Sequence, residues 1–410
     1  MIPSKSHLHR LLIAAALADG ETMLQSAPTE AEDIAATIAC LEALGAEIRY
    51  LDSGGFQAKP LDRGNLPHHA VLSCKESGST LRFMLPIVCA LGVRAEFRME
   101  GRLPDRPMEP LERELTQGGV CLTRPEREIL CCEGQLCSGD FFLPGNISSQ
   151  YITGLLLALP LLKGDSSLTV YEPIESEDYI NMTFAVLETF RQLPEITQNR
   201  YQIRGGKAFQ SPGKAVAEGD WSNAAFWLSA GAMSGGNMRL SGLSPESRQG
   251  DKAVCNILEQ MGAQVCWDGD ILRVSEGTRQ GVEVDATAIP DLIPVLSAVA
   301  AVSKGVTVIR NAARLRLKES DRLTATAETL NALGANIIEQ VDGLEIRGVP
   351  RLRGGAVDAW GDHRIAMTAA IASAACEEPV TITGAEAVRK SYPQFWSELV
   401  RLGKELTEEV

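Results

Sequence analysis

The phrase LEALGAEI at residues 41–48 returns three times, as LTQGGVCL at 115–122, LEQMGAQV at 258–265 and LNALGANI at 330–337. Each copy is typical of a helix end, a glycine turn and a strand start, because glycine adopts a left-handed backbone at little cost. Gly45 and Gly119 lie 74 residues apart, and Gly262, Gly334 and Gly403 follow one another at intervals of 72 and 69 residues. The phrase therefore predicts a structural repeat of about 70 residues.

A second marker keeps the same period. It consists of a serine or aspartate start followed by a strongly apolar helix, and its copies are separated by 73, 71, 72, 70 and 71 residues. The marker positions are Lys5, Gly78, Ser149, Trp221, Asp291 and Asp362. Two markers with one period predict six copies of one α/β unit, grouped as two similar lobes of three. We expect an N-terminal lobe at 5–217 and a C-terminal lobe at 218–410, with residues 1–4 at the hinge.

 The helices that follow the second marker share one character, which HRLLIAAALA at residues 9–18 illustrates. They are apolar on nearly all sides and too short to span a bilayer, so we expect them to be buried inside the protein. A buried helix N-terminus carries free N–H groups and a partial positive charge. If the helices of each lobe run parallel, their N-termini would meet in an interdomain cleft and form an anion site.

The composition limits the class of protein and the partners that the chain can have. The 410 residues are 45% apolar and 22% charged, which indicates a globular protein with more than one core. A formal net charge of −14 argues against a nucleic-acid or membrane partner. The first residues, MIPSKSH, show no basic segment followed by a long apolar run, so we expect a cytoplasmic protein.

The ten cysteines show no CxxC pair and no His/Cys ligand spacing. Four of them lie in apolar helical patterns, which favours buried thiols: Cys40, Cys89, Cys255 and Cys376. Three others cluster on a polar stretch, Cys131, Cys132 and Cys137, but their spacing does not favour a metal site. We therefore expect neither a disulfide framework nor a bound metal.

Basic residues gather at or just after the second marker. They are Lys5, Arg10, Arg82, Arg106, Lys318, Arg322, Arg364 and Lys390. A cation beside a buried apolar helix is costly without an anionic partner, and guanidinium groups match phosphate and carboxylate oxygens in two-point contacts. This pattern predicts small, multiply anionic substrates. The alternative is that the cations form interdomain salt bridges with Asp33, Asp291, Glu319, Asp321 and Asp362.

Two carboxylates are candidates for acid–base chemistry. Asp291 follows Ile289-Pro290 at a helix start, and Glu319 lies between Lys318 and Arg322. Nearby cations favour the ionised form of both groups, and bound ligands can change that balance during a reaction. His363 is a third candidate, although its place between Asp362 and Arg364 is equally typical of a helix start. The sequence contains no GxGxxG, Walker A or HExxH motif.

Ten phrases in this order resemble the enolpyruvyl transferases, and among them the 5-enolpyruvylshikimate-3-phosphate (EPSP) synthase family. They are SKSHLHR (4–10), ESGSTLRF (76–83), DRP (105–107), SSQY (148–151), SEDY (176–179), GDWSNAAFWL (219–228), IPD (289–291), RLKESDR (316–322), GDHRIAM (361–367) and RKSYPQFW (389–396). The related UDP-N-acetylglucosamine enolpyruvyl transferases place a reactive cysteine before the arginine of a mobile loop. The corresponding stretch here, 101–107, contains none.

The resemblance implies an α/β fold of two similar lobes, each built from three βαβαββ units with buried parallel helices. It also implies transfer of the enolpyruvyl group of phosphoenolpyruvate to the 5-hydroxyl of shikimate 3-phosphate, in the shikimate pathway of aromatic amino acid biosynthesis. Members of the family need no metal or organic cofactor and are targets of glyphosate. We expect a monomer with these two small molecules as its only partners. A non-catalytic anion-binding protein of the same fold is the alternative.

The resemblance assigns roles residue by residue. It places shikimate 3-phosphate on Lys5, Ser6, Arg10, Ser148, Ser149, Gln150, Ser176, Asp291 and Lys318. It places phosphoenolpyruvate on Lys5, Gly78, Arg106, Gln150, Arg322, Arg364 and Lys390. The catalytic residues would be Asp291 as base, Glu319 as acid and Lys5 as an assisting group.

The sequence departs from the family at three places. Glu76 and Arg314 stand where family members often have asparagine, so we assign neither to the site. Only four residues precede Lys5, where relatives carry an additional strand. We therefore expect one hinge connection and one sheet edge to be missing, with Lys5, Ser6 and Arg10 on a segment anchored at one end only.

Overall fold

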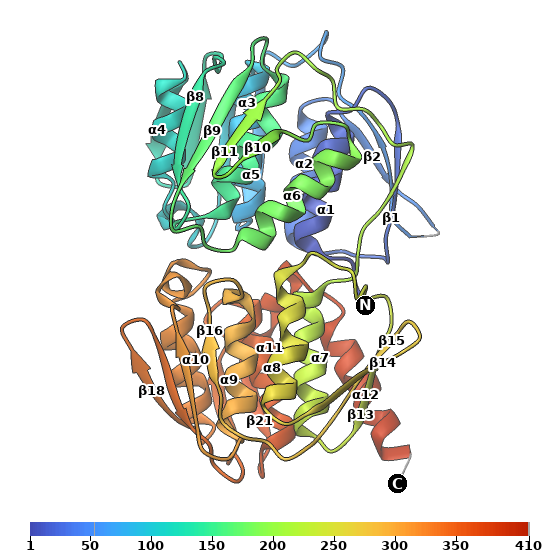
Figure 1. Ribbon diagram of the computed structural model, residues 1–410, viewed down its shortest axis with the longest axis vertical. Coiled ribbons are helices and arrows are strands. Elements are labelled where there is room, and N and C mark those ends of the chain that lie inside the picture. The colour runs from blue at the N-terminus through green and yellow to red at the C-terminus, as the bar shows by residue number, and fades with distance from the viewer. Residues whose placement is uncertain (53, 409–410) are drawn as a thin grey trace. The chain divides into compact units, whose positions relative to one another are not determined.

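The protein divides into two compact units in the computed structural model, which describes residues 1–52 and 54–408 (Figure 1). The N-terminal unit comprises Pro3–Pro28 and Glu32–Ala217. The C-terminal unit comprises Glu218–Val410 together with the short segments Met1–Ile2 and Thr29–Ala31. The last two residues of the predicted C-terminal lobe, 409–410, lie outside the described residues.

The N-terminal unit alternates helices and short strands. Its helices are α1 (Lys5–Ala16), α2 (Glu32–Ala43), α3 (Gly78–Leu91), α4 (Glu109–Gln117), α5 (Ser149–Ala158) and α6 (Glu177–Thr189). Its strands are β1 (Thr22–Gln25), β2 (Glu47–Tyr50), β3 (Phe56–Lys59), β4 (His69–Lys75), β5 (Arg94–Met99), β6 (Cys121–Glu126), β7 (Ile129–Glu133), β8 (Asp140–Pro144), β9 (Ser166–Tyr171), β10 (Glu195–Thr197), β11 (Arg200–Ile203) and β12 (Lys214–Val216). The short 3₁₀ turns η1 (Leu103–Asp105) and η2 (Leu159–Leu161) connect them.

These strands form four-stranded sheets with one common order. The orders are β12-β1-β3-β2, β4-β5-β7-β6 and β8-β9-β11-β10. In each sheet an edge strand pairs in parallel with its neighbour, and the remaining pairs are antiparallel. The second and third sheets are consecutive βαβαββ units. The first sheet takes its parallel edge strand, β12, from the far end of the unit, so it is closed by a distant part of the chain.

The C-terminal unit repeats this plan less completely. Its helices are α7 (Trp221–Met233), α8 (Val254–Gln260), α9 (Ile293–Ala301), α10 (Arg322–Ala332), α11 (His363–Ala372) and α12 (Phe395–Glu408). Its strands are β13 (Asn237–Leu240), β14 (Gln264–Asp268), β15 (Ile271–Ser275), β16 (Glu283–Asp285), β17 (Val306–Arg310), β18 (Asn336–Gln340), β19 (Gly343–Arg347), β20 (Gly355–Asp358) and β21 (Val380–Thr383). The 3₁₀ turns are η3 (Gly250–Ala253), η4 (Pro290–Leu292), η5 (Ala313–Leu317), η6 (Ser373–Ala375) and η7 (Ala385–Lys390).

The sheets of the C-terminal unit differ in size. Only β16-β17-β19-β18 has four strands among the described residues, whereas β13-β15-β14 has three and β20-β21 has two. In the part of the chain that the structure describes, β13 has no parallel neighbour, unlike its counterparts β1, β5, β9 and β17. The repeat is therefore a common framework from which the fourth and sixth copies depart.

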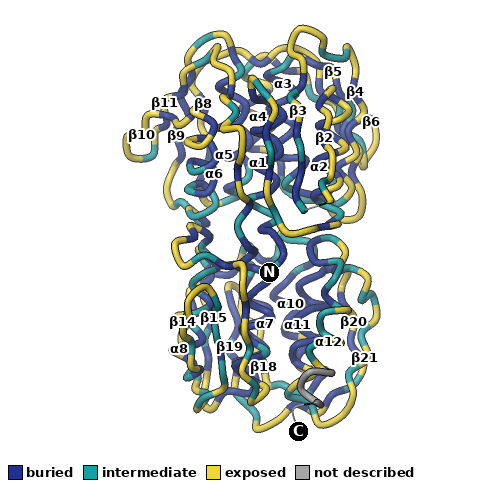
Figure 2. The backbone as a smooth tube through the Cα atoms, turned by 90° about the vertical axis from the view of Figure 1, so that its right-hand side faces the viewer, coloured by how far each residue is buried: buried dark blue, intermediate teal, exposed yellow. Residues whose placement is uncertain are grey.

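The marker helices lie inside the units, as their sequences predict (Figure 2). Helices α3, α5, α9 and α11 are buried over almost their whole length. The predicted caps are also present: the side chains of Ser4, Ser77, Ser148, Asp220 and Asp362 accept hydrogen bonds from backbone N–H groups in the first turns of α1, α3, α5, α7 and α11. Asp291 is the exception. It lies in η4, where no side-chain cap forms, and its carboxylate makes other contacts.

The glycine turns of the first marker form at four of the five positions. Gly45, Gly119, Gly262 and Gly334 have φ angles between +99° and +103°, which is the region that favours glycine. The prediction of a turn at Gly403 is wrong, because α12 continues through this residue to Glu408.

The start of the chain is held in the C-terminal unit. The Met1 ammonium donates a hydrogen bond to the Ser241 carbonyl oxygen at 2.7 Å, and the Asp220 N–H donates to the Ile2 carbonyl oxygen at 3.0 Å. The Ile2 side chain is buried in the core of this unit. The expectation that Lys5, Ser6 and Arg10 lie on a segment anchored at one end only is therefore wrong: Met1–Ile2 anchor the preceding end.

The cysteines of the described residues are all free thiols. Cys40 and Cys89 are buried as predicted, whereas Cys255 and Cys376 are partly exposed. Among the described residues, no group of three or more His, Cys, Asp or Glu side chains could hold a metal ion. No helix within 1–52 or 54–408 is both long and apolar enough to cross a membrane.

Candidate active site

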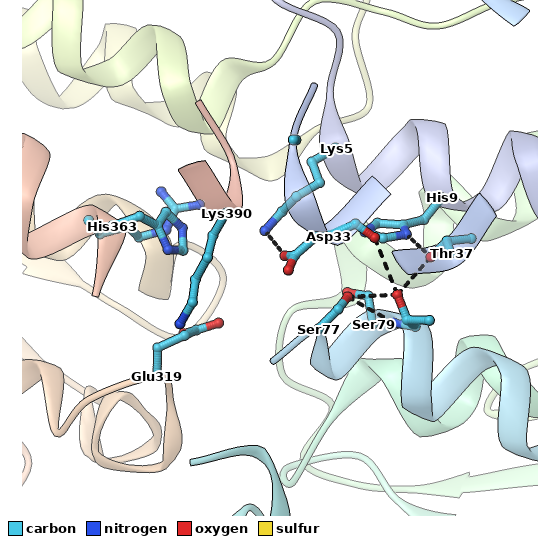
Figure 3. Close-up of polar contacts among 12 residues, drawn as sticks. Lys5, His9, Asp33, Thr37, Ser77, Ser79, Glu319, His363 and Lys390 are labelled. Atoms are coloured by element: carbon cyan, nitrogen blue, oxygen red, sulfur yellow. Dashed lines mark hydrogen bonds and ion pairs between the residues drawn. The ribbon is translucent and has the colours of Figure 1, made fainter. Parts of the chain in front are cut away.

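In the N-terminal unit, the first turn of α1 pairs with α2. Lys5 Nζ lies 2.5 Å from Asp33 Oδ2, and both side chains are mostly buried (Figure 3). Because Ser4 caps the helix, the side chain of Lys5 leaves from the first helical position. Asp33 is one of the carboxylates that the salt-bridge interpretation named, and it neutralises Lys5 within the same unit.

Arg10 lies deeper in the N-terminal unit and is held by neutral oxygen atoms. Its guanidinium donates to the hydroxyls of Thr183 at 2.8 Å and Thr153 at 3.1 Å, and to the carbonyls of Ser6 at 2.6 Å and Tyr179 at 3.0 Å. The residue is 2% exposed, and burial lowers the pKa of its guanidinium to about 9. Among the described residues no carboxylate forms an ion pair with Arg10. Hydroxyl and carbonyl oxygens therefore stabilise its charge without neutralising it.

Two guanidinium groups converge on the first turn of α3. A methyl group placed on Gly78 would lie 2.8 Å from Arg106 Nη1 and 3.1 Å from Arg82 Nη1. Arg82 also donates to Gln150 Oε1 at 2.7 Å and to the Pro107 carbonyl oxygen at 3.2 Å. The missing side chain at Gly78 therefore lets two cations approach a helix N-terminus, which is an arrangement suited to an anion.

The predicted serines lie at helix starts of the same unit. Ser148 caps α5 by accepting from the Gln150 N–H at 3.3 Å, and Ser149 begins that helix. Ser176 precedes α6 with a φ of +55°, so its backbone is in the left-handed region at the helix entry. Predicted residues thus lie at the N-termini of α1, α3 and α5, and α3 packs against both of the other helices.

In the C-terminal unit, Arg322 binds three carboxylates. Its Nη1 lies 2.8 Å from Asp291 Oδ1, its Nη2 lies 2.7 Å from Glu319 Oε2, and its Nε lies 2.7 Å from Asp362 Oδ2. Arg322 is 1% exposed and Asp362 is fully buried. Burial lowers the pKa of Arg322, but the charges of Asp362, Glu319 and Asp291 outweigh this effect and raise it. The guanidinium therefore stays charged and fixes all three carboxylates.

Further cations surround Asp291. Arg364 donates to its carbonyl oxygen at 3.0 Å and to Oδ2 at 3.2 Å, and Lys318 Nζ lies 3.5 Å from Oδ1. Burial lowers the pKa of Lys318 to about 8, against the opposing charge of Asp291. Lys390 donates to the Gly361 carbonyl oxygen at 3.3 Å, and Figure 3 shows its side chain pointing toward Glu319. The predicted residues of this unit are therefore assembled in one cluster.

Sequence reasoning missed several residues of these sites. Thr153 and Thr183 bind Arg10, but a threonine within an apolar helix gives no signal of its own. Arg82 was named as a basic residue and not assigned to the site, although it connects Gln150 to the loop before α4. Asp251 is buried beside the C-terminal cluster, where it accepts a hydrogen bond from Ser222. Burial and the charge of Asp291 raise its pKa to about 7.

Comparison with known proteins identifies the family. The family described as EPSP synthase (3-phosphoshikimate 1-carboxyvinyltransferase) matches residues 1–399. The chain belongs to the EPSP synthase family. It is 41% identical to a 3-phosphoshikimate 1-carboxyvinyltransferase of Clostridium acetobutylicum over 411 aligned residues, covering 99% of this chain and 95% of that protein. A protein of the same name from Clostridium kluyveri is 40% identical over 99% of this chain and 95% of its own length.

Solved structures agree with this assignment. An EPSP synthase from Acinetobacter baumannii superposes with a TM-score of 0.80 at 27% identity, covering 98% of this chain and 94% of that chain. The enolpyruvyl transferase NikO from Streptomyces tendae shares the fold, with a TM-score of 0.77 at 20% identity over 98% and 93% of the two chains. These findings confirm the family, the enolpyruvyl transferase fold and the enzyme class predicted from the sequence, a transferase of aromatic amino acid biosynthesis.

Proposed function

We propose that this enzyme transfers the enolpyruvyl group of phosphoenolpyruvate to the 5-hydroxyl of shikimate 3-phosphate and releases phosphate through a tetrahedral intermediate. The observation that carries the proposal is the fork of Arg322. It holds Asp291 on one terminal nitrogen, at 2.8 Å, and Glu319 on the other, at 2.7 Å. Two carboxylates fixed side by side, with cations around them, supply a base and an acid together with binding sites for anions.

Shikimate 3-phosphate would bind to hydroxyl and cationic groups. Arg10 supplies a buried positive charge that no described carboxylate neutralises, and a substrate anion would complete its surroundings. Lys318 supplies a second cation beside Asp291. The remaining proposed contacts are Lys5, Ser6, Ser148, Ser149, Gln150 and Ser176.

Phosphoenolpyruvate would bind to the guanidinium-rich positions. In the N-terminal unit these are Gly78, Arg106, Lys5 and Gln150. Arg106 approaches Gly78, and Gln150 donates to the Ser79 hydroxyl in the first turn of α3 at 2.8 Å. In the C-terminal unit they are Arg322, Arg364 and Lys390. Several cations are needed because the substrate carries a phosphate and a carboxylate, and each two-point contact also fixes its orientation.

The chemistry assigns one proton transfer to each carboxylate. Asp291 accepts the proton of the 5-hydroxyl while that oxygen bonds to C2 of phosphoenolpyruvate, and Glu319 donates a proton to C3, with Lys5 assisting. The resulting tetrahedral intermediate loses its phosphate group from C2, and the departing phosphate takes up the proton held by Asp291. A C3 proton returns to Glu319 as the double bond forms again. The cations stabilise the charge that develops on the oxygens. The residues of the chain supply the proton transfers and the positive charges, so the proposal includes no organic cofactor or metal.

We extend the proposal to the setting of the enzyme. The formal net charge of −14 supports a protein whose partners are its two substrates and neither nucleic acid nor membrane. A cytoplasmic monomer is part of the proposal.

Phosphate release tests the function directly. The enzyme is mixed with phosphoenolpyruvate and either shikimate 3-phosphate or UDP-N-acetylglucosamine as acceptor. Phosphate and the enolpyruvyl product are expected with shikimate 3-phosphate only. Phosphate release with UDP-N-acetylglucosamine as acceptor would overturn the proposal. So would the absence of phosphate release with both acceptors. Glu319→Gln should slow exchange of the C3 protons of phosphoenolpyruvate with solvent, and unchanged exchange would move the role of acid to Lys5.

A further inference from the structure

A chain of buried hydrogen bonds joins three helices of the N-terminal unit (Figure 3). His9 of α1 lies with Nδ1 at 2.7 Å from Thr37 Oγ1 of α2. Thr37 Oγ1 lies 2.7 Å from Thr80 Oγ1 of α3, and the Thr80 hydroxyl is 2.7 Å from Ser77 Oγ. All four residues are at most 1% exposed. Water therefore does not compete for these bonds, and their directions are set by the groups themselves.

The chain ends at the turn where cations converge. Ser77 caps α3 by accepting from the Thr80 N–H at 3.2 Å, and Gly78, on which Arg106 and Arg82 converge, is the next residue. Thr80 also approaches the Asp33 carbonyl oxygen at 3.4 Å. The network thus connects the start of α3 with the helix that carries the carboxylate partner of Lys5.

Each hydroxyl has one proton, so the chain has two possible directions. If Thr80 donates to Ser77, its single proton is used, so Thr37 must donate to Thr80 and His9 must donate to Thr37 from a protonated Nδ1. If His9 carries its proton on Nε2, then Nδ1 is an acceptor and every bond reverses, so that Ser77 donates to Thr80. The tautomer of one imidazole is therefore coupled to the direction of the hydrogen bonds at Thr37, Thr80 and Ser77.

The far nitrogen of His9 distinguishes the two directions. Nε2 is buried and has no hydrogen-bond partner among the described residues. In the second direction it would be a buried N–H without an acceptor, whereas in the first it is a bare nitrogen. Buried N–H groups without partners are rarer in proteins than acceptors that lack one, so the first direction is favoured.

The ring is also neutral. Burial, followed by the positive charges of Lys5 and Arg10, lowers the pKa of His9 well below its usual value of 6.5. The other charged group of this region is Asp33, which is paired with Lys5. One ring nitrogen therefore keeps a single proton at neutral pH, and the tautomer is a fixed property of the folded protein.

We propose that His9 holds its proton on Nδ1 and directs the chain through Thr37 and Thr80 to Ser77, and thereby positions the first turn of α3 for phosphoenolpyruvate. His9 is a positioning residue that contacts no substrate. The last part of this inference rests on the proposed function, because it takes Gly78 as part of the phosphoenolpyruvate site. The first part, the tautomer and the direction, is independent of any activity.

Nitrogen NMR tests the tautomer on the intact protein. The enzyme labelled with ¹⁵N-histidine has five histidines, and His9→Asn assigns the resonance of interest by its loss. We expect a protonated Nδ1 and a bare Nε2 that do not change between pH 6 and 8. A proton on Nε2 would overturn the proposal whatever the activity of the enzyme.

Steady-state kinetics tests the link to the site. Thr37→Val removes the hydroxyl and keeps the shape, so the KM for phosphoenolpyruvate should rise roughly tenfold, the scale of one buried hydrogen bond. The KM for shikimate 3-phosphate and kcat should stay within about twofold. Thr37→Ser, which retains the hydroxyl, should restore the native value. Thr22→Val is the matched control, because Thr22 is equally buried and its hydroxyl pairs with that of Ser211 at 2.7 Å in another part of the unit.

The outcomes separate the two proposals. An unchanged KM for phosphoenolpyruvate in Thr37→Val, or an equal rise for both substrates, would overturn the positioning role. A native enzyme that forms no product from the two substrates would overturn the proposed function, and the NMR result would still decide the direction of the chain.

Discussion

Arg10 and Arg322 are both buried arginines near the start of a helix, and their surroundings are opposite. Arg10 in the N-terminal unit donates to hydroxyl and carbonyl oxygens. Arg322 in the C-terminal unit contacts the carboxylates of Asp291, Glu319 and Asp362. The first guanidinium retains its full charge, whereas the second is surrounded by more negative charge than it carries.

This difference suits the two units to different roles. A buried cation among neutral partners gains most from an anion that arrives from outside, so the N-terminal unit is suited to binding. A buried cation among several carboxylates already has its partners, and its main effect is to hold them in place. The C-terminal unit is therefore suited to proton transfer, and its other cations, Lys318 and Arg364, add binding to it.

The largest expected difference is in stability. Arg322→Met leaves three carboxylates close together without their common partner, so the free energy of unfolding should fall by about 3–5 kcal/mol. Arg10→Met removes a charge that no described carboxylate neutralises, so the unfolding free energy should change by at most about 2 kcal/mol. Urea denaturation of the two variants measures both values. Equal losses would show that the two arginines do not differ as proposed.

The second prediction concerns turnover. Asp291→Asn keeps the size of the side chain and removes the base, so kcat should fall roughly a hundredfold or more while shikimate 3-phosphate still binds. Asp321→Asn is the matched control. Asp321 caps α10 and pairs with Arg316 at 2.9 Å, and asparagine serves equally well as a cap. Near-native kcat in Asp291→Asn, or an equal loss in Asp321→Asn, would contradict the assignment of the base.

The third prediction uses the pH dependence of Lys318. Its pKa is about 8 in the folded protein and about 10.5 in an unfolded chain, so the folded state binds fewer protons between these values. The contribution of Lys318 to stability should therefore rise with pH from 8 to 10.5. Affinity for shikimate 3-phosphate should fall over the same range, by up to about tenfold per pH unit, because the anion prefers the ammonium form.

Opposite pH dependences of stability and of affinity would identify Lys318 as the group that titrates. Thermal denaturation of the free enzyme and calorimetric titration with shikimate 3-phosphate measure them. Lys318→Met should remove both pH dependences together. If stability and affinity change in the same direction with pH, Lys318 is not the group that titrates.

The sequence predicted the framework better than the contacts. The spacing of the markers and the glycine turns located the repeats, because helix caps and left-handed glycines are local requirements that each copy must satisfy by itself. The sequence also placed cations near Asp291, but it did not say which ones contact the carboxylate. Its partners are Arg322 and Arg364, and such contacts depend on packing between distant segments. No local signal selects the partner among the basic residues of the chain.

Other errors have the same origin. The glycine of the sixth copy, Gly403, lies within α12 because nothing at this position requires a turn. The segment that begins at Lys5 was expected to be anchored at one end only, yet Ile2, which precedes it, is buried in the core of the C-terminal unit. Two threonines that hold Arg10, Thr153 and Thr183, could not be selected from the sequence, since a buried hydroxyl has a role only once its partner is known.

The smallest expected effect separates the two substrates within the N-terminal unit. Gly78 lies in the first turn of α3, where alanine fits the backbone, so Gly78→Ala acts only through its methyl group. That methyl would lie 2.8 Å from Arg106 Nη1 and 3.1 Å from Arg82 Nη1, and the flexible Arg106 side chain would have to move. The KM for phosphoenolpyruvate and the inhibition constant of glyphosate, whose phosphonate and carboxylate would use the same cations, should rise by about three- to tenfold.

Affinity for shikimate 3-phosphate should stay within about twofold, because Arg10 and its partners are untouched. Gly139→Ala is the matched control, since a methyl group there meets no atom within 4 Å. Equal weakening of both substrates in Gly78→Ala would place Gly78 outside the phosphoenolpyruvate site and remove the distinction between the two parts of this unit.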